Sequence, residues 1–170
     1  MPLNIETLIE RKNQWMASHV TDAEYPTPQS LQGLEIYNKY QSQLITSPIE
    51  ACSDFESNLL SFYPVDCHPL TIRYSIVQAG HWENDEAREM AIEFLTQIML
   101  EENSPAQLYV GFYKGKPAAC GMIYSEDDDI ALITDVNAIN IETHQQLRDE
   151  MVSYLVSQAS HHHTELYLQQ

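Results

Sequence analysis

The chain has 170 residues, with 25 acidic and 8 basic side chains and a formal net charge of −17. This length suits one compact domain, and a content of 44% hydrophobic residues is typical of a globular protein. Nucleic acid is an unfavourable ligand because its phosphates require clustered Lys and Arg, and no segment has the long apolar run of a membrane span. We therefore expect a single domain, residues 1–170, that binds neither nucleic acid nor membranes.

The N-terminal segment and the cysteines favour a cytoplasmic location. The opening stretch MPLNIETLIERKNQW carries charges where the apolar region of a signal peptide would stand. The cysteines lack the C-x-x-C spacing of zinc and redox sites.

Three consecutive histidines, His161, His162 and His163, would point to alternate sides of an extended segment and could not all face one ion. We therefore expect no metal site.

The first 69 residues have a helical period. The apolar face of a first helix is formed by Ile5, Leu8, Ile9 and Met16. A second helix opens with Thr27 as N-cap and Pro28 in its first turn, and runs towards Ile45. The segment Ser47-Pro48-Ile49-Glu50 has the pattern of a capping box and predicts a third helix, which Pro64 ends. Its buried stripe would consist of Ile49, Cys52, Leu59 and Phe62.

From Thr71 the period changes to two. Ile72, Tyr74 and Ile76 alternate with polar residues, which predicts a strand that Gly80 ends. The next segment predicts a helix over residues 87–99, with an apolar stripe at the spacing i, i+3, i+4, i+7. This stripe consists of Ala87, Met90, Ala91, Phe94, Leu95, Ile98 and Met99.

Three strands then follow in quick succession. They are predicted over Gln107–Tyr113, Ala118–Tyr124 and Ile130–Val136, and the short polar turns between them fix an antiparallel meander. A helix comes next, and Thr164–Leu168 is a final strand. The face of that helix is marked by Leu147, Met151, Tyr154, Leu155 and Gln158. The order β, α, β, β, β, α, β predicts an α+β fold behind an N-terminal helical region.

Two stretches resemble the GNAT (Gcn5-related N-acetyltransferase) superfamily. YVGFYKGKPAACGMIY resembles the second and third strands of that family with their hairpin, and IALITDVNAI resembles its fourth strand. The resemblance spans about residues 70–170 and implies a mixed, mostly antiparallel sheet flanked by helices. It also implies an N-acyltransferase that uses acetyl-CoA or another acyl-CoA. In that family the pantetheine chain lies between the fourth and fifth strands, and the pyrophosphate meets the N-terminus of the following helix.

The resemblance also implies site residues. Asp135, in the fourth strand, would be the catalytic residue. The acyl-CoA would be held by Val136, Ala138, Thr143, His144, Gln146 and Arg148. The family's Q/R-x-x-G-x-G/A pattern places Thr143 at its first position and Gln146 and Arg148 at its glycines, so the pattern is degenerate here. An alternative is that Thr143 and Gln146 form a capping box that seals the start of the helix.

Three functions remain open from the sequence. One is a GNAT-like protein with lost or altered acyl-CoA binding and a binding or regulatory role. Another is an active N-acetyltransferase with an atypical cradle. The third is an acidic adaptor or chaperone-like protein that docks a basic partner protein. The fifth strand stands near the end of the sequence, so we expect its edge to be covered by the N-terminal region or by a second copy in a homodimer.

Overall fold

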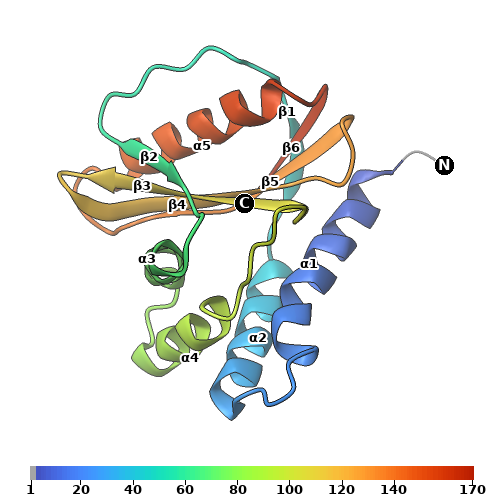
Figure 1. The fold of residues 1–170 in the computed structure, drawn as a ribbon. Helices are drawn as coiled ribbons and strands as arrows, with labels where there is room; N and C mark the ends of the chain where they lie inside the picture. Colours follow the sequence, from blue (N-terminus) through green and yellow to red (C-terminus); the bar gives the residue numbers. More distant parts are fainter. Residues whose placement is uncertain (1–2) are drawn as a thin grey trace.

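The computed structural model describes residues 3–170. A six-stranded sheet has the order β1-β6-β5-β4-β3-β2, and every neighbouring pair is antiparallel except β5 and β6 (Figure 1). The elements are α1 (Ile5–Thr21), α2 (Pro28–Gln41), β1 (Thr46–Ile49), β2 (Ser61–Pro64), α3 (His68–Ala79), α4 (Asp85–Leu95), β3 (Ala106–Tyr113), β4 (Lys116–Tyr124), β5 (Ile130–Ala138), α5 (His144–Ser160) and β6 (Glu165–Gln169). The α+β fold with an N-terminal helix is confirmed.

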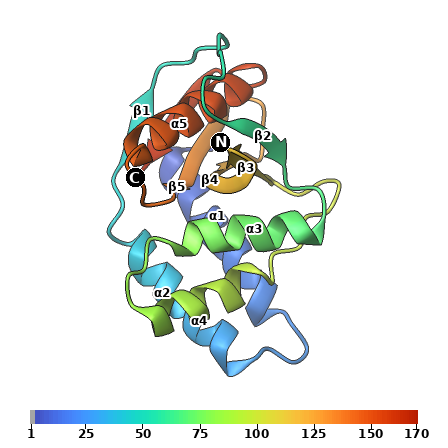
Figure 2. The same cartoon turned by 90° about the vertical axis from the view of Figure 1, so that its left-hand side faces the viewer.

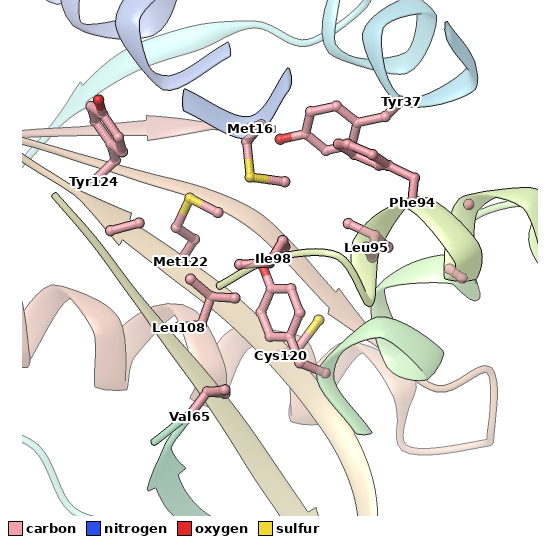
Figure 3. Close-up of a cluster of buried hydrophobic side chains, with 14 of the residues drawn as sticks. Met16, Tyr37, Val65, Phe94, Leu95, Ile98, Leu108, Cys120, Met122 and Tyr124 are labelled. Carbon is pink, nitrogen blue, oxygen red and sulfur yellow. The ribbon is translucent and has the colours of Figure 1, made fainter. Parts of the chain in front are cut away.

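Helices cover both faces of the sheet. α5 packs on one face, and α1, α2, α3 and α4 lie on the opposite side (Figures 1 and 2). The alternation of β4 explains this, since Cys120 and Met122 join the core shared with α1 to α4, whereas Ala119 and Ile123 join the core under α5. Figure 3 shows part of the first core, where Met122 and Leu108 from the sheet face Met16 and Phe94 from the helices.

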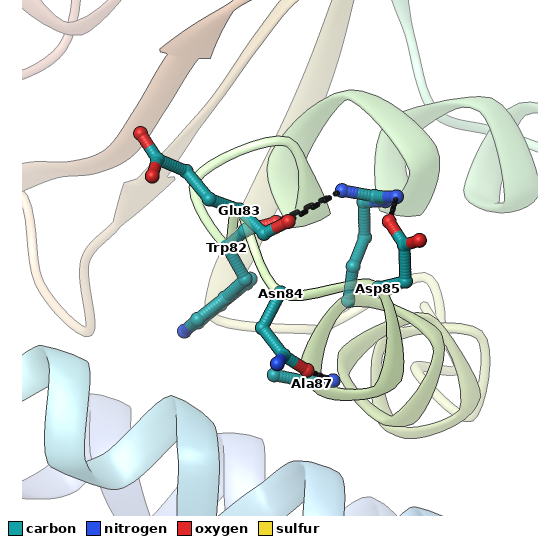
Figure 4. Close-up of polar contacts among 6 residues, drawn as sticks. Trp82, Glu83, Asn84, Asp85 and Ala87 are labelled. Carbon is teal, nitrogen blue, oxygen red and sulfur yellow. Dashed lines mark hydrogen bonds and ion pairs between the residues drawn. The ribbon is translucent and has the colours of Figure 1, made fainter.

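The start of α4 is fixed by local side-chain contacts. Asn84 is the N-cap, and its side chain accepts a hydrogen bond of 3.0 Å from the backbone N–H of Ala87 (Figure 4). Arg88 pairs with Asp85 and also donates to the carbonyl oxygen of Trp82 at 3.1 Å. The Asn84 contact satisfies an N–H that the first turn of a helix leaves unpaired, and Arg88 ties this turn to the preceding segment.

The apolar stripe of α4 faces the other helices. Ala91, Phe94 and Leu95 are buried, as the sequence predicts, whereas Met99 lies beyond the end of the helix and is 72% exposed. α2 crosses α4 so closely that a Cβ on Gly33 would lie 2.0 Å from the carbonyl oxygen of Met90. Only glycine fits this crossing without a shift of the backbone.

The predicted meander of β3, β4 and β5 is confirmed. β3 and β4 are joined by a two-residue turn in which both Lys114 (φ 51°) and Gly115 (φ 80°) have left-handed backbone conformations. This is the geometry of a type I′ hairpin, whose twist matches that of the flanking strands. The last helix and the last strand are also present as α5 and β6.

The predicted third helix over residues 47–63 is wrong. Residues 46–49 form β1, which pairs with β6 from Thr46↔Gln169 to Ile49↔Leu166, and residues 61–64 form β2 at the opposite edge of the sheet. The connection between them passes along α5, where the Glu150 carboxylate accepts from the backbone N–H groups of Leu59 and Leu60. Tertiary pairing has overridden the local capping pattern, and Pro48 is tolerated because β1 is an edge strand.

The predicted strand over residues 71–76 is also wrong, because these residues lie in α3. Ile72 and Ile76 are 38% and 54% exposed, whereas Thr71, Tyr74 and Ser75 are buried. The buried positions follow a spacing of i, i+3, i+4, which is that of a helix. The apolar alternation was therefore a coincidence of two exposed isoleucines one helical turn apart.

The edge of β6 is covered within the chain by β1, so the expected need for a second copy at this edge disappears.

None of the helices in residues 3–170 combines the length and the apolar character needed to cross a bilayer. Cys52 and Cys67 are exposed free thiols, and Cys120 is buried.

Candidate functional site

The β5–α5 junction, residues 134–148, lies where the parallel ladder of β5 and β6 ends. The ladder runs from Ile130↔Glu165 to Ile133↔Leu168, whereas β5 continues to Ala138 beside β4 alone. Beyond the ladder, Thr134 donates a hydrogen bond of 2.8 Å to the side chain of Gln169. The second half of β5 therefore has one edge that no strand covers.

A β-bulge shapes this half of β5. Cys120 pairs with Asn137 and Met122 with Thr134, so Gly121 alone lies opposite both Asp135 and Val136. Asp135 has a φ of 56°, which Asp adopts more easily than most residues. A Cβ on Gly121 would lie 2.4 Å from Cδ1 of Leu155, so glycine also allows α5 to approach the bulge.

The bulge holds the carboxylate of Asp135 in a buried set of hydrogen bonds. Asp135 is 2% exposed. Its Oδ2 accepts from the Tyr37 hydroxyl at 2.7 Å, and its Oδ1 accepts from Nε2 of Gln41 at 2.9 Å. Both donors belong to α2, so a helix near the N-terminus satisfies an acid of the sheet.

Lys12 provides the opposite charge. It is fully buried, and its Nζ donates to Oε1 of Gln41 at 2.6 Å and lies 3.4 Å from the Tyr37 hydroxyl. Gln41 therefore bridges Lys12 and Asp135, and we call these four side chains the buried network. Burial lowers the pKa of Lys12, although the nearby Asp135 charge opposes this shift. Burial and Asp135 raise the pKa of Tyr37, which keeps its hydroxyl a proton donor.

Tyr40 and His81 form a second pair of side chains, close enough to Asp135 and Arg148 for both charges to affect their pKa values. The Tyr40 hydroxyl is 3.3 Å from Nδ1 of His81, and the two rings are 4.6 Å apart. Burial lowers the pKa of His81 to about 4; Asp135 opposes this shift, and the positive charge of Arg148 adds to it. His81 is therefore neutral near pH 7.

The first turn of α5 is not sealed by the predicted capping box. Thr143 is the N-cap residue, but its side chain makes no capping hydrogen bond, and its Oγ1 is buried without a partner. Nδ1 of His144 lies 2.9 Å from the carbonyl oxygen of Ile139, while Gln146 is exposed. Arg148 is half-buried and forms no ion pair with any residue of the described range 3–170.

Comparison with known proteins was made by sequence and by structure. No model of a protein family matches the sequence, and no curated protein matches it significantly. A GCN5-related N-acetyltransferase from Kribbella flavida matches 75% of this chain and 47% of its own length, with a TM-score of 0.52 and 13% identity. A functionally unknown conserved protein from Staphylococcus epidermidis matches 82% of this chain and 68% of its own, with a TM-score of 0.51 and 10% identity. The fold is GNAT-like.

All seven predicted site residues lie in the β5–α5 junction, which is one continuous segment of the chain. Asp135, Val136 and Ala138 lie in β5, and Val136 and Ala138 are buried in the core under α5. The predicted residues of the helix start are Thr143, His144, Gln146 and Arg148, which all lie within the first turns of α5 or at its cap. The chain spans about half the length of the Kribbella protein, so the likeness supports the fold alone.

Sequence reasoning missed the partners of Asp135. Lys12, Tyr37 and Gln41 come from the N-terminal helices, and nothing near Asp135 in sequence points to them. One signal was present in α1, because Lys12 lies four residues from both Leu8 and Met16 and so shares their buried face. A lysine on such a face predicts a polar partner in the core.

The junction has one feature that favours an anion and two that do not favour acyl transfer. Arg148 favours an anion, because it lies near the N-terminal end of α5, where the helix dipole also favours negative charge, and has no ion pair within residues 3–170. The exposed Gln146, however, stands where the family pattern has glycine. On the sheet side, both carboxylate oxygens of Asp135 already accept hydrogen bonds from α2.

Proposed function

We propose that this protein is a GNAT-fold binding or regulatory module in which acyl-CoA binding is lost or altered, and that it works in the cytoplasm. The observation that carries the proposal is the engagement of Asp135 by Tyr37 and Gln41 of α2. Exposed, unpaired thiols at Cys52 and Cys67 suit a reducing compartment.

A general base must reach the proton that it removes. Its acceptor atom has to lie within hydrogen-bond distance of the substrate or of one bridging water. Asp135 is 2% exposed, and its oxygens contact the Tyr37 hydroxyl and the Gln41 amide instead. A substrate amine could reach the carboxylate only if α2 moved away, which would also remove the Gln41 bridge between Asp135 and the buried Lys12. Such a loss is costly because it leaves buried charges without partners.

The start of α5 also differs from a glycine cradle, which supports the same proposal. Glycine lets backbone N–H groups approach a pyrophosphate closely, whereas a side chain at the same position occupies that space. Gln146 and Arg148 carry side chains at both positions where the family pattern has small residues. Four acids of the neighbourhood, Asp135, Glu142, Asp149 and Glu150, also oppose a polyanion.

The second candidate function is an active N-acetyltransferase with an atypical cradle. Arg148 favours it, since an arginine in the second turn of a helix, without an acidic partner in the described residues, can bind phosphate with two parallel hydrogen bonds. In this case side chains would replace the glycine amides. The acidic adaptor, by contrast, is supported by the net charge of −17 alone.

A calorimetric titration with acetyl-CoA tests the proposal. We expect no saturable binding at cofactor concentrations up to about 1 mM. Arg148→Ala and the exposed Lys39→Ala are the matched variants, because each removes one positive charge. Micromolar binding that falls about tenfold in Arg148→Ala and is unchanged in Lys39→Ala would overturn the proposal in favour of the acetyltransferase.

Turnover is tested separately. The protein is incubated with acetyl-CoA and a mixture of primary amines, and released CoA is measured by chromatography, because the exposed thiols of Cys52 and Cys67 would react with a thiol reagent. The proposal predicts no release above the rate without amine. Amine-dependent release would contradict it.

A further inference from the structure

A hollow of about 620 Å³ lies between β2, the turn that joins β3 to β4, and α3. β2 is the edge strand at this side of the sheet, and α3 lies beneath the sheet (Figure 1). We call it the basic hollow and define it by Tyr63, Leu70, Arg73, Phe112 and Lys114, which line it. It shares none of these residues with the β5–α5 junction. Its volume lies within the usual range for small-molecule sites.

The charge of the basic hollow is opposite to that of the protein as a whole. Two of the 8 basic side chains line it, Arg73 and Lys114, and no acidic side chain does. Neither forms an ion pair with a residue in the described range. Arg73 donates only to the backbone carbonyl oxygen of Pro69, at 3.0 Å, and Nζ of Lys114 lies 5.1 Å from the ring centre of Tyr113. In a protein with 25 acids, two neighbouring cations without acidic partners leave room for an external anion.

Aromatic rings form the rest of the wall. Tyr63 and Phe112 meet edge to face with ring centres 5.4 Å apart, and Tyr63 is 51% exposed. Leu70 adds an aliphatic surface from α3. A flat apolar body can pack against such rings, and the contact contributes beyond the area that it buries. The hollow thus combines two perpendicular aromatic rings with two cations.

The turn does not by itself explain the lysine. Lys114 occupies the first central position of the hairpin turn with a φ of 51°, where Asn, Asp or Gly is preferred. A non-glycine residue without a short polar side chain is strained in this conformation. Asn would make the better turn, so the turn alone does not account for an ammonium group beside the hollow.

We propose that the basic hollow binds a small carboxylate with a planar aromatic body. The guanidinium of Arg73 would take the carboxylate with two parallel hydrogen bonds, Lys114 would add a second positive charge, and the aromatic body would pack on Tyr63 and Phe112. This site is independent of any acyl-CoA at α5.

The test uses 2-naphthoate as the probe, with ¹H–¹⁵N chemical-shift titration to locate it. We expect saturable shifts at the backbone amides of Tyr63, Arg73 and Lys114. The neutral analogue 2-naphthamide and the aliphatic anion acetate should each bind about tenfold more weakly, because each lacks one of the two recognised features. Equal affinity for naphthoate and naphthamide, or shifts centred outside the hollow, would overturn the proposal.

Charge-removing variants sharpen the test. Arg73→Gln should weaken naphthoate binding by about tenfold, and Lys114→Asn should weaken it by a smaller factor. Lys114→Asn supplies the residue that the turn prefers, so its melting temperature should not fall, and a loss of affinity there cannot come from unfolding. Lys39→Gln, on α2, removes a charge away from the hollow and should leave the affinity unchanged. Unchanged binding in both Arg73→Gln and Lys114→Asn would refute the proposal.

Discussion

Tyr37→Phe removes a single oxygen from the centre of the buried network. Tyr37 is fully buried, and its hydroxyl donates to Oδ2 of Asp135 at 2.7 Å. The same hydroxyl lies 3.4 Å from Nζ of Lys12. The ring of Tyr37, which packs 5.3 Å from that of Phe94, would remain in the variant. The substitution therefore tests the hydrogen bond and leaves the packing in place.

The expected loss follows from the charge of the acceptor. A hydrogen bond to a charged group contributes about 1.5 to 3 kcal/mol, more than one between neutral groups. No water can replace the hydroxyl easily, because Asp135 and Lys12 are both buried. We expect Tyr37→Phe to lower the free energy of unfolding by about 2 kcal/mol, which for a chain of this size lowers the melting temperature by roughly 4 to 8 °C.

Urea unfolding followed by circular dichroism gives the difference directly. Tyr63→Phe is the matched control, because Tyr63 is 51% exposed and makes no hydrogen bond through its hydroxyl within residues 3–170; its effect should stay within about 0.5 kcal/mol. If Tyr37→Phe is no more destabilising than this control, Asp135 does not depend on the hydroxyl. The case for an immobilised carboxylate would then fail.

Three other substitutions test the helices. Phe94→Ala should cost about 3 to 5 kcal/mol in thermal unfolding because the side chain is fully buried, and an unchanged melt would place it at the surface. Gly33→Ala should destabilise by about 1 to 3 kcal/mol despite the better helix propensity of Ala, since its Cβ would meet the Met90 carbonyl at 2.0 Å; a gain in stability would refute the close crossing. Folding lowers the pKa of His81 from 6.5 to about 4. As the pH falls, the unfolded chain therefore takes up the proton first. The contribution of His81 to stability is full above pH 6.5 and is lost as the pH falls towards 4. Between about pH 7 and pH 5 the wild type should lose up to about 2 kcal/mol more than His81→Gln in urea unfolding, and equal losses would contradict the lowered pKa.

The second half of the fold could be predicted because its local and tertiary signals agree. In β3, β4 and β5 the turns are short and the strands are neighbours in both sequence and space, so the register follows from the hairpins. α4 and α5 also carry their buried residues at helical spacing. In each case the pattern that the sequence shows is the one that the core uses.

Residues 46–79 could not be predicted in the same way. β1 pairs with a strand more than a hundred residues later, and no local signal marks such a partner. In α3 the largest aliphatic residues, Ile72 and Ile76, face outwards, while Thr71 and Ser75 face the core. Apolar periodicity therefore assigns the wrong residues to the core, because the exposed Ile72 and Ile76 are more hydrophobic than the buried Thr71 and Ser75.

Only part of the candidate site could be predicted from the sequence, for a related reason. Asp135 stands in a segment that resembles a family strand, so the sequence could point to it. Its donors, Tyr37 and Gln41, are 98 and 94 residues away and look like ordinary residues of an amphipathic helix. Their role follows from the position of α2 against the bulge, which depends on the whole fold.

The N-terminal region closes this side of the sheet at two places. β1 pairs with β6 along its outer edge, and α2 holds Asp135 where β5 continues beyond β6. Removing the region would expose a strand edge that favours association, and it would leave the Asp135 carboxylate without the opposite charge of Lys12. α1, α2 and β1 are therefore integral to the fold, and any ligand that approaches Asp135 from their side must displace α2. The proposed loss of acyl-CoA chemistry is compatible with a stable GNAT-like fold, because α2 then uses Asp135 as a structural residue.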